Sequence, residues 1–164
     1  MASRNENVID NSTQLTVSQH QYLWTWQGQP LKVVYETLGE GTPVLLLPAF
    51  STVSSRSEMR PIAESLSAKF KTVSLDFPGF GQSERLAVDY IPELYQQFLQ
   101  DFVQDIFDSP TAIIAAGHTA GYVIQLAQKL PKAVSKIVLV APTWRGPLPT
   151  MGAKPQVSGM VRQI

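Results

Sequence analysis

The chain has 164 residues, of which 44% are hydrophobic and 16% charged, and its 13 basic and 13 acidic residues balance to a formal net charge of zero. This length suits a single domain, and the charge balance lacks the basic excess typical of nucleic-acid-binding proteins. No apolar run reaches the roughly 20 residues that span a bilayer, and the N-terminus lacks the apolar core of a secretory signal. The sequence contains no cysteine, which excludes disulfides, thiolate metal sites and a cysteine nucleophile. We therefore expect a cytoplasmic protein with no membrane span and no nucleic-acid partner.

The N-terminal part predicts a polar arm followed by an antiparallel hairpin. Residues 1–20 are rich in Asn, Ser, Gln and Thr, and are expected to form a flexible arm. Tyr22, Trp24 and Trp26 then alternate with other residues, which places them on one face of a strand. A turn leads into a second extended run over 31–36. Alternating tryptophans on a hairpin indicate packing against the core rather than a ligand platform.

Beyond residue 43, short apolar strands alternate with amphipathic helices. We expect strands over 44–47, 71–75, 111–116 and 136–140. We expect helices over 59–70, 89–107 and 121–130. Strands that are apolar on both faces and separated by helices predict an α/β fold, with a mostly parallel sheet covered by helices on both faces and an N-terminal antiparallel hairpin.

One motif in this series of strands and helices is typical of a catalytic site. The strand over 111–116 runs into Gly117-His118-Thr119-Ala120-Gly121 and then into a helix. This is the spacing of the G-x-S-x-G nucleophile elbow, a sharp strand-to-helix turn that lifts a hydroxyl above the sheet. Thr119 stands at the position of the nucleophile.

With these features the chain resembles the N-terminal half of an α/β-hydrolase-fold protein of the esterase or lipase type. The resemblance covers roughly residues 22–150 and rests on ordered features: the hairpin, the strand 44–47 with Pro48-Ala49-Phe50, the D-x-x-G-x-G-x-S run over 76–83, the elbow, and the strand and turn over 137–142. It implies a flexible arm at 1–20, the N-terminal part of the domain at 21–141, and the truncated start of a cap or lid at 142–164.

The resemblance also implies a site. Thr119 would be the nucleophile, and the backbone N–H groups of Phe50 and Ala120 would bind the oxyanion. Attack on a small ester-like substrate would give an acyl-enzyme that water releases, with no cofactor and no metal. The run from Asp76 to Ser83 lacks the third glycine of a phosphate-binding loop, so we interpret it as a structural turn.

The catalytic acid and base of such a site are missing from the sequence. No Asp, Glu or His follows Thr119, although in the family both partners follow the nucleophile. His118 could be a general base, but its place beside the nucleophile position favours a packing role. Threonine is also β-branched, which disfavours the positive φ of an elbow nucleophile and leaves a purely structural role for its hydroxyl. We therefore expect a truncated chain that is inactive alone.

Two alternatives remain open at this stage. The chain could be a non-catalytic small-ligand-binding or scaffold protein on the same fold, or one half of a hydrolase that another chain completes. In the last case the strand over 137–140 would be an exposed apolar edge, which favours self-association.

Overall fold

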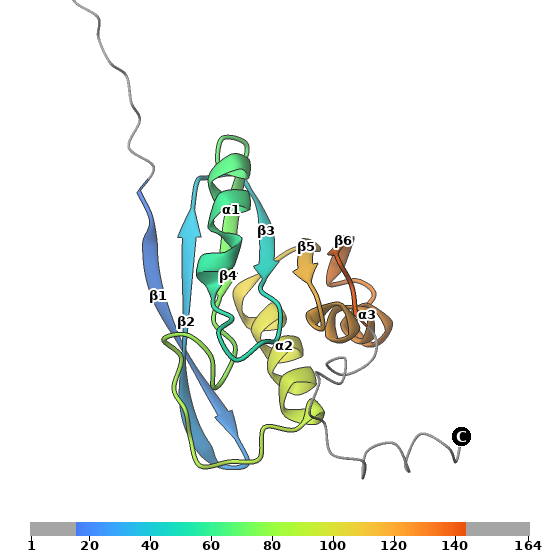
Figure 1. The fold of residues 1–164 in the computed structure, drawn as a ribbon. Coiled ribbons are helices and arrows are strands. Elements are labelled where there is room, and N and C mark those ends of the chain that lie inside the picture. Colours follow the sequence, from blue (N-terminus) through green and yellow to red (C-terminus); the bar gives the residue numbers. More distant parts are fainter. Residues whose placement is uncertain (1–15, 144–164) are drawn as a thin grey trace, which may run out of the picture.

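In the computed structural model, residues 16–143 are described, and they form a six-stranded sheet with helices on both faces (Figure 1). The strands are β1 (Ser18–Trp26), β2 (Gln29–Leu38), β3 (Thr42–Leu47), β4 (Phe70–Leu75), β5 (Thr111–Ala116) and β6 (Val134–Val140). The helices are the 3₁₀ turn η1 (Arg56–Met59), α1 (Arg60–Leu66), α2 (Pro92–Ile106) and α3 (Thr119–Lys129). The spatial order of the strands is β1-β2-β4-β3-β5-β6, antiparallel from β1 to β4 and parallel from β4 to β6. The expected α/β class, with its leading hairpin and mostly parallel sheet, is confirmed.

The hairpin is fastened to helix α2 by its aromatic face. The indole Nε1 of Trp24 donates to Asp101 at 2.8 Å, and the hydroxyl of Tyr22 donates to Asp105 at 2.7 Å. The Trp24 ring also meets Phe98 edge-on at 5.2 Å. These contacts fix the strand register, because a shift by one residue would turn the aromatic face away from the helix.

The first strand begins earlier than the sequence predicts. It starts at Ser18, so the last three residues of the expected arm at 1–20 belong to β1. Residues 1–15 lie outside the described part of the chain, as does all but the first two residues of the expected cap region at 142–164.

Alternating side chains of the central strands supply two apolar layers. Leu45 and Leu47 of β3 face α2 and α3, where they join the larger core. Val44 and Leu46 face the opposite side and pack with Met59 and other residues of the η1–α1 segment. Both layers are buried, which explains why these strands read as unbroken apolar runs.

All three helices differ in extent from those the sequence predicts. The segment expected as one helix over 59–70 forms η1 and α1, which ends at Leu66, and Phe70 already belongs to β4. Helix α2 starts at Pro92, and Ile91, whose side chain is 40% exposed, forms its extended N-cap. Helix α3 starts at Thr119, two residues before the expected start at Gly121. The earlier start of α3 moves the turn between β5 and α3, which changes the geometry of the candidate site.

A buried ion-pair network holds the turn after β4. The carboxylate of Asp76 accepts hydrogen bonds from the backbone N–H groups of Arg56 at 2.6 Å and Gln82 at 2.9 Å, and it pairs with the Arg56 guanidinium. Arg56 also contacts Glu36 at 3.0 Å. The Ser83 hydroxyl donates to the Asp76 carbonyl at 2.6 Å. Since these groups bond to one another, the D-x-x-G-x-G-x-S run is a structural turn, as the sequence predicts.

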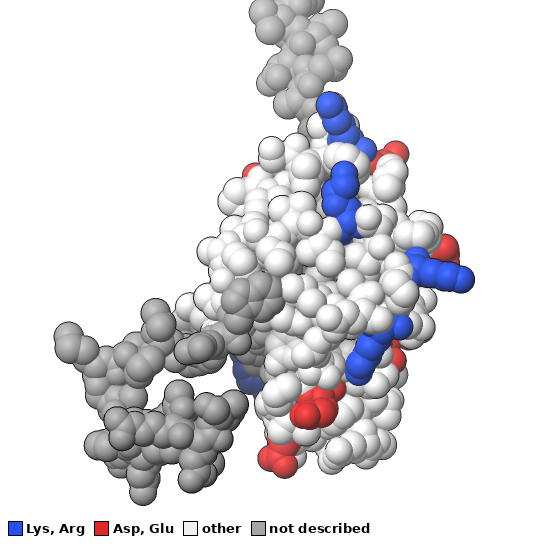
Figure 2. Space-filling view, turned by 90° about the vertical axis from the view of Figure 1, so that its right-hand side faces the viewer, with Lys and Arg blue, Asp and Glu red and all other residues white. Residues whose placement is uncertain are grey.

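Strand β6 forms one edge of the sheet and leaves two valines exposed. On the α3 side, Ile137 and Leu139 pack against the core. On the α1 side, Val138 and Val140 are 45% and 43% exposed. Figure 2, which faces the side of the molecule where β6 lies in Figure 1, shows an uncharged area beside a line of Lys and Arg side chains. Between residues 16 and 143 no helix is long and apolar enough to cross a membrane.

Candidate functional site

The corner between β5 and α3 falls on Gly117. Its φ is +55°, in the left-handed region, whereas His118 is already helical with φ −66° and ψ −23°. The N–H of Gly117 donates to the Val140 carbonyl at 3.0 Å, and the Gly117 carbonyl accepts the N–H of Thr143 at 3.2 Å. These bonds tie the corner to the end of β6. The strained position of the strand–turn–helix elbow, where a nucleophile would sit, is therefore occupied by a residue without a side chain.

The hydroxyl of Thr119 lies inside the protein rather than above the sheet. The residue has no exposed surface, and its Oγ1 donates to the Pro48 carbonyl at 2.5 Å. Glycine adopts a positive φ at little cost, while a β-branched residue there is a genuine outlier. This explains why the turn places Gly117 at the corner and Thr119 in the first turn of α3.

The two expected oxyanion donors differ in their surroundings. The N–H of Ala120 donates to the Gly117 carbonyl at 3.3 Å, and Ala120 is fully buried. Phe50 follows β3 as expected, but its conspicuous feature is the ring, which lies among four other aromatic rings. Their centroids are 4.7–5.2 Å away and belong to Phe77, Phe80, Tyr95 and Tyr122.

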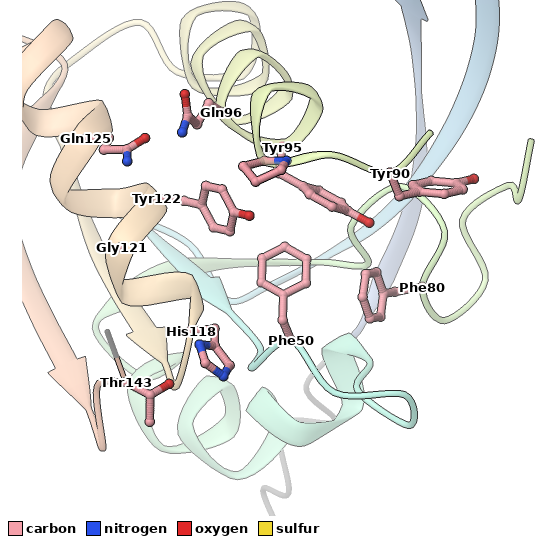
Figure 3. Close-up of a pocket in the computed structure, with 11 residues that line it drawn as sticks. Phe50, Phe80, Tyr90, Tyr95, Gln96, His118, Gly121, Tyr122, Gln125 and Thr143 are labelled. Carbon is pink, nitrogen blue, oxygen red and sulfur yellow. The ribbon is translucent and has the colours of Figure 1, made fainter. Parts of the chain in front are cut away.

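All of these rings except Phe77 line a pocket of about 600 Å³ at the carboxyl ends of β3 and β5 (Figure 3). The pocket lies where open α/β sheets generally bind ligands, outside the carboxyl ends of the strands. Its lining residues come from the loops after the strands and from the N-terminal halves of α2 and α3: Phe50, Phe80, Tyr90, Pro92, Tyr95, Gln96, His118, Gly121, Tyr122, Gln125 and Thr143. In Figure 3 the side chains of Gln96 and Gln125 lie at one end and His118 with Thr143 at the other.

No Asp, Glu, Lys or Arg is among the described residues that line this pocket. Burial raises the pKa of Tyr95 and of Tyr122, and the charge of Glu93 raises that of Tyr122 further. Both phenols are therefore neutral at pH 7. The pocket offers apolar ring surface and uncharged hydrogen-bonding groups.

His118 lines the pocket, half-buried, and has no carboxylate partner within the described residues. The sequence favoured a packing role for it in the turn. An imidazole that serves as a base in a triad is oriented by a carboxylate, and this contact is missing between residues 16 and 143. The same part of the chain contains no group of three His, Asp or Glu side chains that could hold a metal ion.

The sequence reasoning missed the aromatic character of the site. The sequence implicates Phe50 only through its backbone N–H, and Tyr95 lies within the helix expected over 89–107. The place of Tyr122 near the site could have been predicted, since it comes directly after the glycine-rich turn and one turn before Gln125 on the same helix. Contacts that join two loops and two helices cannot be predicted from such local spacing.

Comparisons with known proteins agree with the architecture. The sequence model described as "Alpha/beta hydrolase family" matches residues 44–162. No curated protein matches the chain. Solved structures do match: a serine hydrolase involved in carbazole degradation, the CarC enzyme, is similar with a TM-score of 0.68 and 18% identity over 78% of this chain and 50% of that one.

Two further structures show the same similarity. The haloalkane dehalogenase DatA from Agrobacterium tumefaciens C58 has a TM-score of 0.68 and 19% identity over 87% of this chain and 47% of its own. The thioesterase domain from the curacin biosynthetic pathway has a TM-score of 0.68 and 17% identity over 88% of this chain and 51% of its own. The chain thus spans about half the length of the structures it matches.

Proposed function

The chain belongs to the alpha/beta hydrolase family, and from this premise we propose that it binds a small uncharged molecule in the aromatic pocket without supplying the nucleophile of the family's chemistry. The observation that carries the proposal is the corner at Gly117, which has no side chain, together with the buried hydroxyl of Thr119. A protein that attacks a substrate needs a nucleophile within reach of both the substrate and a base.

The pocket itself supports binding. Its volume of about 600 Å³ is within the range of small-molecule sites, which are mostly apolar with a few polar groups. Ring surface from Phe50, Phe80 and Tyr122 provides the apolar area, and Gln96 and Gln125 provide hydrogen bonds. A charged ligand would lose its hydration on entering the pocket and would find no ionic partner in the lining, which costs free energy.

The sequence-based hypothesis of an esterase requires Thr119 to act as the nucleophile, whereas the proposed binding function does not. If a further segment or a partner chain supplied an acid and a base, Gly117 would still stand at the corner, and Thr119 would have to break its bond to Pro48 to react. Fold alone does not decide between these functions, since one architecture serves many activities.

Two measurements on the full chain test the proposal. Repeated turnover of p-nitrophenyl acetate is expected to be the same in the wild type, Thr119→Ser and Thr119→Ala, at the level of the uncatalysed reaction. Acetophenone and cyclohexyl methyl ketone, neutral molecules that cannot be hydrolysed, are expected to raise Tm as their concentration rises. Turnover that Thr119→Ala abolishes, or a Tm that neither ketone changes, would overturn the proposal.

A further inference from the structure

We infer that the ligand of this pocket is a planar aromatic molecule carrying a neutral hydrogen-bonding group, such as an aromatic amide or a phenol. The inference rests on the proposed binding function and specifies its ligand class. Five aromatic side chains, those of Phe50, Phe80, Tyr90, Tyr95 and Tyr122, line one space.

The mutual angles of these rings favour an aromatic guest. Phe50 meets Phe80, Tyr95 and Tyr122 at interplanar angles of 67°, 62° and 66°. In this edge-to-face arrangement, electron-poor ring edges and electron-rich ring faces both border the pocket. A flat aromatic ring can continue the pattern, and each such pair contributes about 0.5–1.5 kcal/mol beyond buried area. An aliphatic ring of the same size gains the buried area alone.

The same angles argue against a cationic guest. Quaternary ammonium groups are bound by cages whose ring faces point at the cation. Here Phe50 lies inside the cluster and contacts its neighbours edge-on, so the faces do not converge on one point. No carboxylate lines the pocket to balance a positive charge, and no basic residue lines it to balance a negative one.

Polar groups of the pocket that have no partner among the described residues define the neutral substituent. Two phenols are already engaged: Tyr95 donates to the Pro78 carbonyl at 3.2 Å, and Tyr90 accepts the Leu86 N–H at 2.8 Å. By contrast, the side-chain amides of Gln96 and Gln125 and the hydroxyl of Tyr122 form no hydrogen bond within residues 16–143. Each amide offers both donors and an acceptor, which matches a neutral amide or hydroxyl better than an ion.

The test compares four probes by calorimetry or ligand-observed NMR on the full chain. 2-Naphthamide is the expected ligand, its saturated analogue decahydronaphthalene-2-carboxamide tests the aromatic requirement, and 2-naphthoate and benzyltrimethylammonium test charge. We expect 2-naphthamide to bind about tenfold more tightly than the saturated amide, as a few edge-to-face pairs predict, and more tightly than either ion.

Variants locate the site. Tyr122→Phe keeps the ring and removes the hydroxyl, so it is expected to weaken 2-naphthamide about threefold to tenfold, the effect of one neutral hydrogen bond. Phe50→Leu is expected to abolish the preference for the aromatic amide over the saturated one. Phe107→Leu is the matched control, because Phe107 lies in a separate hollow beside Pro131 and its loss should leave all four affinities unchanged.

The outcomes separate the two proposals. If neither amide binds, the binding function itself fails. If both amides bind equally, or if an ion binds most tightly, the binding function stands and the inferred ligand class is overturned. Equal weakening by Tyr122→Phe and Phe107→Leu would also overturn the assignment to this pocket.

Discussion

Thr119 and Pro48 are joined by a buried hydrogen bond, with the threonine Oγ1 donating to the proline carbonyl at 2.5 Å. The bond links the first turn of α3 to the residue that follows β3, although the two are far apart in the sequence. This bond occupies the hydroxyl of the elbow motif, and it supports the proposal that Thr119 does not act as a nucleophile.

Removing this hydroxyl should destabilise the fold. Thr119→Val preserves the shape of the side chain but leaves the Pro48 carbonyl without its donor, which costs about 1–3 kcal/mol of unfolding free energy. Thr119→Ser keeps the donor and loses one buried methyl group, for about 1 kcal/mol. Urea unfolding of both variants measures the difference. A valine variant as stable as the wild type would show that the bond contributes nothing.

The turn after β4 should depend on glycine at position 81. Gly81 has a φ of +50°, and a Cβ there would overlap the carboxylate of Asp76. Gly28 also has a positive φ, +81°, but a Cβ there meets nothing within 4 Å. Gly81→Ala is therefore expected to cost more than about 3 kcal/mol, and Gly28→Ala only the backbone strain of about 1 kcal/mol. Equal losses in thermal unfolding would contradict the role of the Asp76 contact.

Buried phenols should make the fold sensitive to alkali. Burial raises the pKa of Tyr95, and burial with the hydrogen bond to Asp105 raises that of Tyr22. Unfolded tyrosines ionise near pH 10, so above that pH the unfolded chain binds fewer protons than the native one. Stability is therefore complete below about pH 10 and falls as pH rises further.

A single substitution isolates this effect. Tyr95→Phe should reduce the slope of unfolding free energy against pH, above pH 10, by up to one proton, about 1.4 kcal/mol per pH unit. Urea titrations at pH 9, 10 and 11 measure the slope. An unchanged slope would mean that Tyr95 ionises equally in both states.

The edge at β6 is expected to mediate self-association, as the sequence predicts for residues 137–140. An edge strand with exposed valines presents unpaired backbone groups beside an apolar surface. Light scattering should show a molar mass that rises with concentration, and Val138→Lys should lower it. Val53→Lys is the control, because Val53 is 85% exposed but lies in a loop. A wild-type chain that stays monomeric at high concentration would refute the prediction.

The sequence predicted the scaffold well because its signals are local. Leu45 and Leu47 read as a buried strand, and Trp24 and Trp26 as a packed hairpin face, since alternation and apolar runs follow directly from strand geometry. The turn at Asp76 was also predictable, because its carboxylate and glycines lie within a few residues of one another.

The site was less predictable, because it depends on the register of one turn. The G-x-S-x-G spacing fits Thr119, but the backbone takes its positive φ at Gly117, two residues upstream. The penalty for a β-branched residue at such a corner was visible in the sequence, although the shift that relieves it was not. The cluster around Phe50 joins the loops after β3 and β4 with helices α2 and α3, and only folding brings these segments together.

The absence of native cysteine permits the most direct test of the central claim, that the corner of the elbow is Gly117 and not Thr119. Single variants Gly117→Cys and Thr119→Cys are treated with iodoacetamide, and alkylation is followed by intact mass. Because a built Cβ at Gly117 lies 3.1 Å from the Ala49 Cβ, the first variant is also made with Ala49→Gly. Circular dichroism confirms that each variant is folded.

We expect the thiol introduced at position 117 to react at least about tenfold faster, since it lies at a helix N-terminus where thiolates are stabilised. The thiol at position 119 should be protected until the chain is unfolded, because the residue it replaces has no exposed surface. Faster alkylation at position 119 than at position 117 would contradict the placement of the corner at Gly117 and would support Thr119 as the nucleophile position.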